Sequence, residues 1–281
     1  MAVVANILET RQHLMPAIKF WVSPLCLEPS DPGNSTPGHR DRVILFDILD
    51  AFHRAGGNFI NIASNPRKPW IEKTIGYWMK MRNTRKDMLG VKADSVMDSL
   101  ESSLRRLDRP WVDIFYVHQH SEEHSAKYDA DFVLRGVSDT LPDAYYARLC
   151  RFVVYRGTWF AYSRDFEHEI QPMCKTHELG VTLCDIPEEA EAIRIVTQEL
   201  RKVATKANAT IANTALAYMK HVSPEAVPIV RVSSVKQLES RVQALHIKIT
   251  ASDIRQIAAA ARIRPIFSHE PLPYTRQQDA A

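Results

Sequence analysis

Segments with strand character and segments with helix character alternate along most of this chain. Apolar residues recur at helical spacing through Asp41 to Ala55, Asp94 to Leu107 and Ile193 to Ala207. Short apolar runs, such as Val112 to Val117 and Val181 to Cys184, lie between those stretches. This order predicts a parallel sheet covered by helices, and periodicity alone leaves a doubly wound sheet and a (β/α)8 barrel open.

The remaining elements follow from the same patterns and from their boundary residues. Further predicted strands are Asn58 to Ile62, Phe132 to Val137, Phe152 to Tyr155 and Val227 to Val230. Further predicted helices are Arg164 to Leu179 with a cap at Gly180, Ile211 to His221, Val235 to Leu245, and one that starts at Thr250 with Asp253 three residues on. Pro, Gly, Ser and Asn are frequent from Glu28 to Arg40, which predicts a loop. No Gly-x-Gly-x-x-Gly follows a strand, which disfavours the doubly wound dinucleotide fold.

Length and charge favour one globular domain over residues 1–281. The 36 basic and 33 acidic residues are scattered and leave a net charge of +3, so no basic stripe predicts nucleic-acid or lipid binding. The longest apolar runs are too short for a membrane span. Met1 to Thr10 lacks a basic leader and a clear cleavage site, so we expect a cytoplasmic protein.

Cysteine and histidine spacing does not favour a metal site. The four cysteines form no Cys-x-x-Cys pair, which predicts reduced, mostly buried thiols. His118 and His120 share a strand face, but the third candidate ligand, His124, falls in a polar segment without an anchor. The prediction is therefore that no metal binds. Glycine is also scarce, with 9 in 281 residues, whereas phosphate-cradling loops usually need it.

One segment carries the strongest functional signal. Gly57 to Pro66 reads G-N-F-I-N-I-A-S-N-P and resembles the second-strand motif of the aldo-keto reductases, G-N-F-I-D-T-A-x-x-Y. Other similar pieces follow in the family's order and spacing: Val22 to Leu27, Leu49 to Phe52, Ile75 to Lys80, Ser99 to Leu107, Val112 to His118, Gly136 to Asp139 and Pro228 to Val230. The resemblance covers almost the whole chain and is greatest to the fungal aryl-alcohol dehydrogenase and norsolorinic acid reductase branch. It implies a (β/α)8 barrel with its site at the carboxyl ends of the strands, and with shortened segments around 120–132 and 185–192.

The chain departs from that family at the residues of its chemistry. Members reduce carbonyls with NADPH through an aspartate, a tyrosine, a lysine and a histidine. By resemblance, Lys92 and His118 match the lysine and the histidine, whereas Asn61 stands at the aspartate and Pro66 at the proton-donating tyrosine. Proline cannot protonate an oxygen, and proton transfer by a positioned acid contributes about 10²–10⁴ in rate. We therefore expect that ordinary carbonyl reduction is lost, and that Lys92, His118 and Asn61 form the catalytic set.

The positions that the family uses for its cofactor differ as well. The family's P-I-x-G-G-R-K reads Pro228 to Ser234 here, with Arg231 and Val232 in place of both glycines. Arg156 stands at the glutamine that holds the nicotinamide amide. Ser138 of the G-x-S-N motif is retained, and Arg231, Lys236 and Arg241 are candidate phosphate contacts or, equally, a solvated face. The preferred prediction is that no cofactor binds, and NADP is the alternative.

Aromatic residues near the presumed mouth suggest a substrate pocket. Trp70, Tyr155 and Trp159, together with Arg156, are the candidate lining residues, and the alternative is that the rings fill the core. The preferred hypothesis is an enzyme of fungal secondary metabolism that catalyses a non-redox isomerisation, epimerisation, cyclisation or elimination on a hydrophobic oxygenated small molecule. One alternative is an NADPH-dependent oxidoreductase in which water or His118 supplies the proton. The other is a non-catalytic scaffold barrel, and an oligomer is compatible with each hypothesis.

Overall fold

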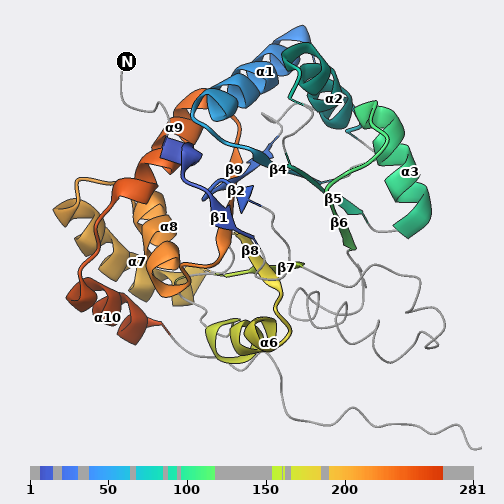
Figure 1. The fold of residues 1–281 in the computed structure, drawn as a ribbon. Coiled ribbons are helices and arrows are strands. Elements are labelled where there is room, and N and C mark those ends of the chain that lie inside the picture. Colours follow the sequence, from blue (N-terminus) through green and yellow to red (C-terminus); the bar gives the residue numbers. More distant parts are fainter. Residues whose placement is uncertain are drawn as a thin grey trace, which may run out of the picture.

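A computed structural model of the protein contains one parallel sheet of seven strands with helices around it (Figure 1). The structure describes residues 7–14, 21–30, 38–63, 68–84, 88–93, 96–117, 154–159, 161, 166–184 and 190–261. The strands of the sheet are β3 (Cys26–Pro29), β4 (Phe59–Ala63), β5 (Met88–Ala93), β6 (Ile114–Val117), β7 (Val154–Thr158), β8 (Gly180–Cys184) and β9 (Val227–Val232).

The helices follow the strands in sequence and lie outside them (Figure 1). They are α1 (His39–Arg54), α2 (Trp70–Arg82), α3 (Val96–Leu107), α6 (Gln171–Thr176), α7 (Ala190–Lys206), α8 (Ile211–Val222), α9 (Val235–Gln243) and α10 (Ala251–Ala260). A π-helical turn, η2 (Phe166–Ile170), precedes α6, and short 3-10 turns lie at η1 (Ile7–Glu9) and η3 (Ala244–His246). A separate antiparallel pair joins β1 (Gln12–His13) to β2 (Trp21–Val22).

The strand order is that of a (β/α)8 barrel. It runs β6-β5-β4-β3-β9-β8-β7, so the first strand of the sheet, β3, pairs with the last, β9. A sheet curls into a barrel when its first and last strands meet, and a doubly wound sheet does not bring them together. The fold class expected from the sequence is therefore confirmed. The predicted strand Phe132 to Val137 lies outside the described residues, as does most of each predicted shortened segment.

Alternation along the strands separates an inner from an outer layer of the core. Phe59 and Ile229 belong to a buried cluster inside the sheet, together with Cys26, Ile114, Tyr116, Cys184 and Val227. Leu27 and Ile60 lie on the outer face and pack with α1 and α2. The β1–β2 pair lies at the amino ends of the strands, because Asn58 bonds Ser23 and Trp21 there at 2.7 and 2.9 Å. The carboxyl ends form the other end of the barrel.

Most predicted helices and strands within the described residues are present, and two predictions at element boundaries were wrong. Glu28 and Pro29 lie in strand β3 and not in a loop, since the Glu28 carboxylate is neutralised inside the barrel. Gly180 begins β8 and does not cap a helix. Instead Glu178 takes the left-handed conformation at φ 54°, and the N–H of Leu179 closes the turn on the Cys174 carbonyl at 2.8 Å.

Three further elements differ from the prediction: one helix was missed, one is divided, and one strand is longer. Helix α2 was not predicted, although Ile75 to Lys80 within it resemble a segment of the aldo-keto reductases. The helix predicted from Arg164 to Leu179 is divided between η2 and the short α6 over its described part. Strand β7 continues to Thr158 beyond the predicted end at Tyr155, because the charge of Arg156 is paired within the barrel and does not end the strand.

Candidate active site

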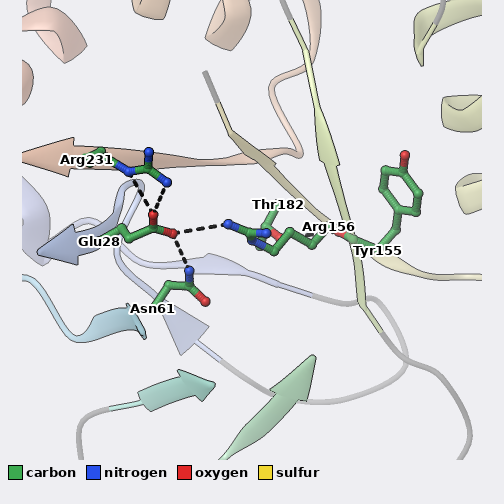
Figure 2. A network of polar contacts seen from close by, with 6 residues as sticks. All are labelled: Glu28, Asn61, Tyr155, Arg156, Thr182 and Arg231. Atoms are coloured by element: carbon green, nitrogen blue, oxygen red, sulfur yellow. Dashed lines mark hydrogen bonds and ion pairs between the residues drawn. The ribbon is translucent and has the colours of Figure 1, made fainter. Parts of the chain in front are cut away.

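A buried glutamate organises the carboxyl end of the barrel (Figure 2). Glu28 of β3 is 4% exposed. Its Oε2 accepts hydrogen bonds from Nδ2 of Asn61 at 2.6 Å and from Nη2 of Arg156 at 3.1 Å. Its Oε1 accepts from Nε and Nη2 of Arg231 at 2.9 and 2.6 Å. We call Glu28, Asn61, Arg156 and Arg231 the Glu28 cluster.

The sheet register brings these four residues together from four strands. Glu28 lies directly opposite Arg231 on the neighbouring strand β9. On the other side, Leu27 lies opposite Ile60, which puts Asn61 of β4 next to Glu28. Arg156 comes from β7, two strands beyond β9 in the sheet, and its long side chain reaches across the barrel to Glu28 (Figure 2). The curl of the sheet is therefore required for the cluster.

The cluster holds Glu28 ionised and carries excess positive charge. Burial opposes ionisation of Glu28, but the charges of Arg156 and Arg231 and the hydrogen bonds from Arg231 and Asn61 outweigh it and lower the pKa of Glu28. Two guanidinium groups face one carboxylate, so the cluster has a net charge of one positive unit. An ionised carboxylate with four hydrogen-bond donors is not a proton donor for catalysis.

Two polar atoms of the cluster are left without partners. Asn61 is 0% exposed, and its Oδ1 accepts no hydrogen bond. Nε of Arg156 is also buried and donates none. Buried polar atoms of this kind are uncommon in native proteins, although the described residues hold others, such as Oε1 of Glu72 and Oγ1 of Thr84. Within the described part of the chain, the cluster therefore offers one free acceptor and one free donor.

Two other ionisable groups, in the buried cluster inside the sheet, are held protonated. Burial, followed by the nearby charge of Glu28, raises the pKa of Cys26 well above its ordinary value. Burial is also the main cause that raises the pKa of Tyr116, on β6. Neither group is therefore poised as a nucleophile or a base at neutral pH. No group of three or more metal-ligating side chains occurs among the residues that the structure describes.

The predicted catalytic residues are only partly within the described structure. Asn61 lies in the cluster, where its amide is committed to Glu28. Lys92 lies in β5 opposite Ala63, two positions after Asn61 along β4, and opposite Tyr116 on β6. His118 and Ser138 lie outside the described residues, as does Pro66.

The predicted aromatic pocket is not assembled around the cluster. Tyr155 points away from Glu28 (Figure 2) and stacks on Phe166 at 5.9 Å between ring centroids, in the outer core. The reason is strand alternation: Arg156 faces inward, so its neighbour Tyr155 faces the helices. Trp70 begins α2 and is buried in the outer core between the sheet and the helices. Tyr155 and Trp70 therefore fill the core, as the alternative interpretation of the sequence held.

Trp159 and two of the predicted phosphate contacts lie near a cavity beside the cluster. This cavity, of about 70 Å³, is lined by Arg231 and Arg241 and by the apolar side chains of Trp159, Ala161, Ala215, Leu216, Met219 and residues 228–230. Arg241 also donates from Nη1 to Oδ1 of Asn213 at 3.4 Å. Lys236 is exposed on α9 and does not line the cavity.

Sequence reasoning missed Glu28, the centre of the site. Its place after the apolar run Leu25 to Leu27 was overlooked because the following residues predicted a loop. A usable signal was present: Arg156 and Arg231 each come directly after a predicted strand, and arginines on the inner face of a barrel require an anion. Three positions at which the chain departs from the family thus contact one carboxylate.

Comparison with known proteins agrees with this architecture. The model of the aldo/keto reductase family matches residues 187–262. Norsolorinic acid reductase B of Dothistroma septosporum is 28% identical over 331 residues, covering 93% of this chain and 84% of the relative. Aryl-alcohol dehydrogenase [NADP(+)] of Phanerodontia chrysosporium is 28% identical over 322 residues, covering 87% and 84%.

Solved structures show the same fold. A thermostable aldo-keto reductase, Tm1743, superposes with a TM-score of 0.67 at 20% identity, covering 90% of this chain and 100% of that one. An aldo/keto reductase from Klebsiella pneumoniae in complex with NADP and acetate superposes with a TM-score of 0.63 at 17% identity, covering 87% and 94%. None of the described helices is both long and apolar enough to cross a bilayer. The chain thus has the (β/α)8 barrel fold of the aldo-keto reductases, and its sequence is similar to those of fungal norsolorinic acid reductases and aryl-alcohol dehydrogenases.

Proposed function

We propose that this protein is an NADP(H)-dependent oxidoreductase that interconverts a carbonyl and an alcohol in a hydrophobic, oxygenated small molecule. The relatives named above are reductases and alcohol dehydrogenases, and one structural neighbour holds NADP. The observation that carries the proposal is that the substituted positions form one connected polar cluster at the carboxyl end of the barrel. A site that had lost its function would not need to keep three polar side chains ordered around a buried carboxylate.

The residues present fit the anionic part of a dinucleotide. Arg241 lines the cavity and exposed Lys236 lies in the first turn of α9, so both can hold phosphate oxygens, whereas Arg231 is already bonded to Glu28. NADPH, when bound, supplies a hydride. This proposal therefore replaces the sequence-based preference for no cofactor. Ser138, the fourth predicted contact, lies outside the described residues.

The proton must come from a group other than the family's tyrosine. Glu28 is held ionised, and Cys26 and Tyr116 keep their protons in the buried interior. His118, which matches the family's histidine in sequence, or a water molecule is the proton source in this proposal. Asn61 orients the substrate oxygen in this scheme, because its Oδ1 can accept a hydrogen bond from the alcohol hydroxyl.

A second candidate is the non-redox proton transfer first expected from the sequence, with Lys92 and His118 as acid and base. The observation that favours it is the rebuilt site itself: Asn61 and Arg156 both bind Glu28, so neither has the role that the family gives its position. Isomerisation, epimerisation, cyclisation or elimination would then proceed without a dinucleotide. The two candidates differ in one measurable property, which is hydride transfer.

The deciding experiment follows NADPH by fluorescence and then by isotope. The purified protein is titrated with NADPH, and an aromatic aldehyde such as 2-naphthaldehyde is reduced with NADPH deuterated at C4 of the nicotinamide. We expect saturable binding and deuterium in the alcohol. We also expect Arg241→Gln to weaken NADPH binding by about tenfold, the effect of one lost charge-assisted contact. Arg255→Gln, an exposed arginine on α10, is the control and should bind as the wild type does.

Two results would reject the redox proposal. The first is that the folded protein does not bind NADPH, because the proposed reaction then has no hydride donor. Turnover of a substrate without deuterium transfer assigns the site to the non-redox candidate. A folded protein that binds neither NADPH nor small molecules would instead be the scaffold barrel.

A further inference from the structure

The Glu28 cluster has more cationic donors than its own carboxylate uses. Arg231 directs both Nε and Nη2 to a single oxygen, Oε1 of Glu28. Its Nη1 has no partner among the described residues, and its side chain is 58% exposed. Arg156 uses Nη2 on Glu28, and its buried Nε has no partner. Among the described residues, the cluster therefore has two N–H groups without a partner: Nη1 of Arg231, on a side chain that is more than half exposed, and the buried Nε of Arg156.

The excess charge is not a simple solvated surface charge. The Arg156 side chain is only 17% exposed, so part of the positive charge lies where water screens it weakly. Arg231 also lines the cavity that apolar side chains wall, including Trp159, Leu216 and Met219. A hydrophobic ligand with one anionic group matches this combination of apolar wall and unpaired guanidinium.

Asn61 adds a second, independent requirement. Its Oδ1 is buried and lacks a donor, while its amide N–H₂ is held by Glu28. Because Glu28 holds the amide N–H₂, Oδ1 is the atom of the Asn61 amide that is left without a partner. An acceptor beside a cationic group is complementary to a hydroxyl that neighbours an acid group.

We propose that the Glu28 cluster recognises a carboxylate on the substrate, so that the substrate is a hydrophobic oxygenated carboxylic acid. The inference names the substrate class of the proposed function and rests on that function for the reaction. The carboxylate is bound by the free N–H groups of Arg231 and Arg156, and Asn61 accepts a hydrogen bond from a substrate hydroxyl. Glu28 is a positioning residue, which holds both arginines and limits the excess charge to one unit.

The test compares two ligands of the same shape that differ in charge. Binding of 2-naphthoate and of its neutral amide, 2-naphthamide, is measured by calorimetry on the full chain, without and with saturating NADP⁺. We expect the wild type to prefer the naphthoate by about tenfold, as for one charge-assisted contact. Arg231→Gln should abolish this preference and leave naphthamide binding within about twofold of the wild type.

Two further variants sharpen the test. Arg255→Gln removes an exposed arginine of α10 and should keep the full preference. Glu28→Gln raises the net charge of the cluster to two positive units and should strengthen naphthoate binding several-fold. Arg231→Gln decides the test even if Glu28→Gln fails to fold, because Arg231 is the more exposed arginine of the cluster.

The possible outcomes separate a substrate carboxylate from a cofactor phosphate. Equal affinity of the wild type for naphthoate and naphthamide overturns the proposal. It is also overturned if Arg231→Gln weakens NADP⁺ binding but keeps the preference for naphthoate, since the anion recognised would then be a phosphate of the dinucleotide. The preference is measured without turnover, so failure of the redox proposal leaves this result interpretable.

Discussion

In the part of the chain that the structure describes, two buried glutamates pair with arginines, and they do so in different ways. Glu72 of α2, 1% exposed, forms an ion pair with Nε of Arg106 on α3, between two outer helices. One cation meets one anion there, and Arg106 also donates to Ser103 at 3.1 Å. Glu28 meets two arginines and an asparagine inside the barrel, where four strands converge.

The difference in charge balance separates packing from recognition. The Glu72–Arg106 pair is neutral as a unit and joins neighbouring helices, so its effect is on the position of α3 against α2. The Glu28 cluster has one cation too many and one arginine that is more than half exposed. Both sites contain a buried polar atom without a hydrogen-bond partner, Oε1 of Glu72 in one and Oδ1 of Asn61 in the other, so the charge balance is what separates them. Unbalanced charge beside a cavity favours an anionic ligand.

The largest expected effect is on the helix pair. Arg106→Met should remove the cation and leave Glu72 buried without a counter-charge. We expect the free energy of unfolding to fall by about 3–5 kcal/mol, as for other broken buried pairs. Urea denaturation measures this loss, and the preference of the folded protein for naphthoate over naphthamide should stay unchanged. A changed preference would mean that the two charge clusters are coupled.

An intermediate effect is expected at Glu28, and it depends on pH. Glu28→Gln should lower the unfolding free energy by about 2 kcal/mol at pH 7, through loss of charge-assisted hydrogen bonds. The pKa of Glu28 is lowered in the folded state, so its contribution is present above the unfolded pKa of about 4.3 and is lost as the pH falls through the folded value. Denaturation from pH 7 down to pH 2 should therefore show a steeper loss in the wild type than in the variant. If the unfolding free energies of the wild type and the variant fall in parallel with pH, Glu28 is not ionised in the folded protein as assigned.

The smallest stability effect is expected when the family's residue is restored at position 61. Asn61→Asp places a second carboxyl next to Glu28, where the amide nitrogen now lies 2.6 Å from Oε2. Repulsion between the two carboxylates should raise the pKa of one of them and lower the unfolding free energy by about 1 kcal/mol at pH 7, an effect that shrinks as the pH falls.

The same variant bears on recognition. A second carboxylate balances the two arginines, so Asn61→Asp should also abolish the preference for naphthoate. Adding Glu28→Gln to Asn61→Asp returns the cluster to one carboxylate. The double variant should therefore recover part of the unfolding free energy and part of the preference for naphthoate. If the double variant is no better than either single change, the two positions do not share one charge balance.

Local features of the structure were largely predictable from the sequence. The cap that begins α10 is an example: the N–H of Asp253 bonds Oγ1 of Thr250 at 3.1 Å, and the N–H of Thr250 bonds Asp253 at 3.3 Å, as the spacing had indicated. Strand β8 and helix α8 likewise lie where apolar runs and periodicity placed them. Such features depend on residues a few positions apart, which a sequence displays directly.

The active-site prediction was less complete, because its contacts join distant parts of the chain. Asn61, Arg156 and Arg231 lie 33, 128 and 203 positions from Glu28. The sequence marked these three residues as departures from the family, but it did not show that Glu28 is their common partner. Tyr155 shows the same limit, since its neighbour Arg156 takes the inward face and leaves the ring in the outer core.

The sequence alone thus determined a parallel sheet covered by helices, because the periodicity of apolar residues is a property of the chain itself. Its resemblance to the aldo-keto reductases implied the barrel, and residue identity fixed proline instead of tyrosine at position 66. Only the tertiary structure decided that a carboxylate on β3 gathers the substituted side chains into one site with excess positive charge. The physical reason is register and curvature: which inward-facing residues meet depends on how the strands are aligned and on how the sheet closes.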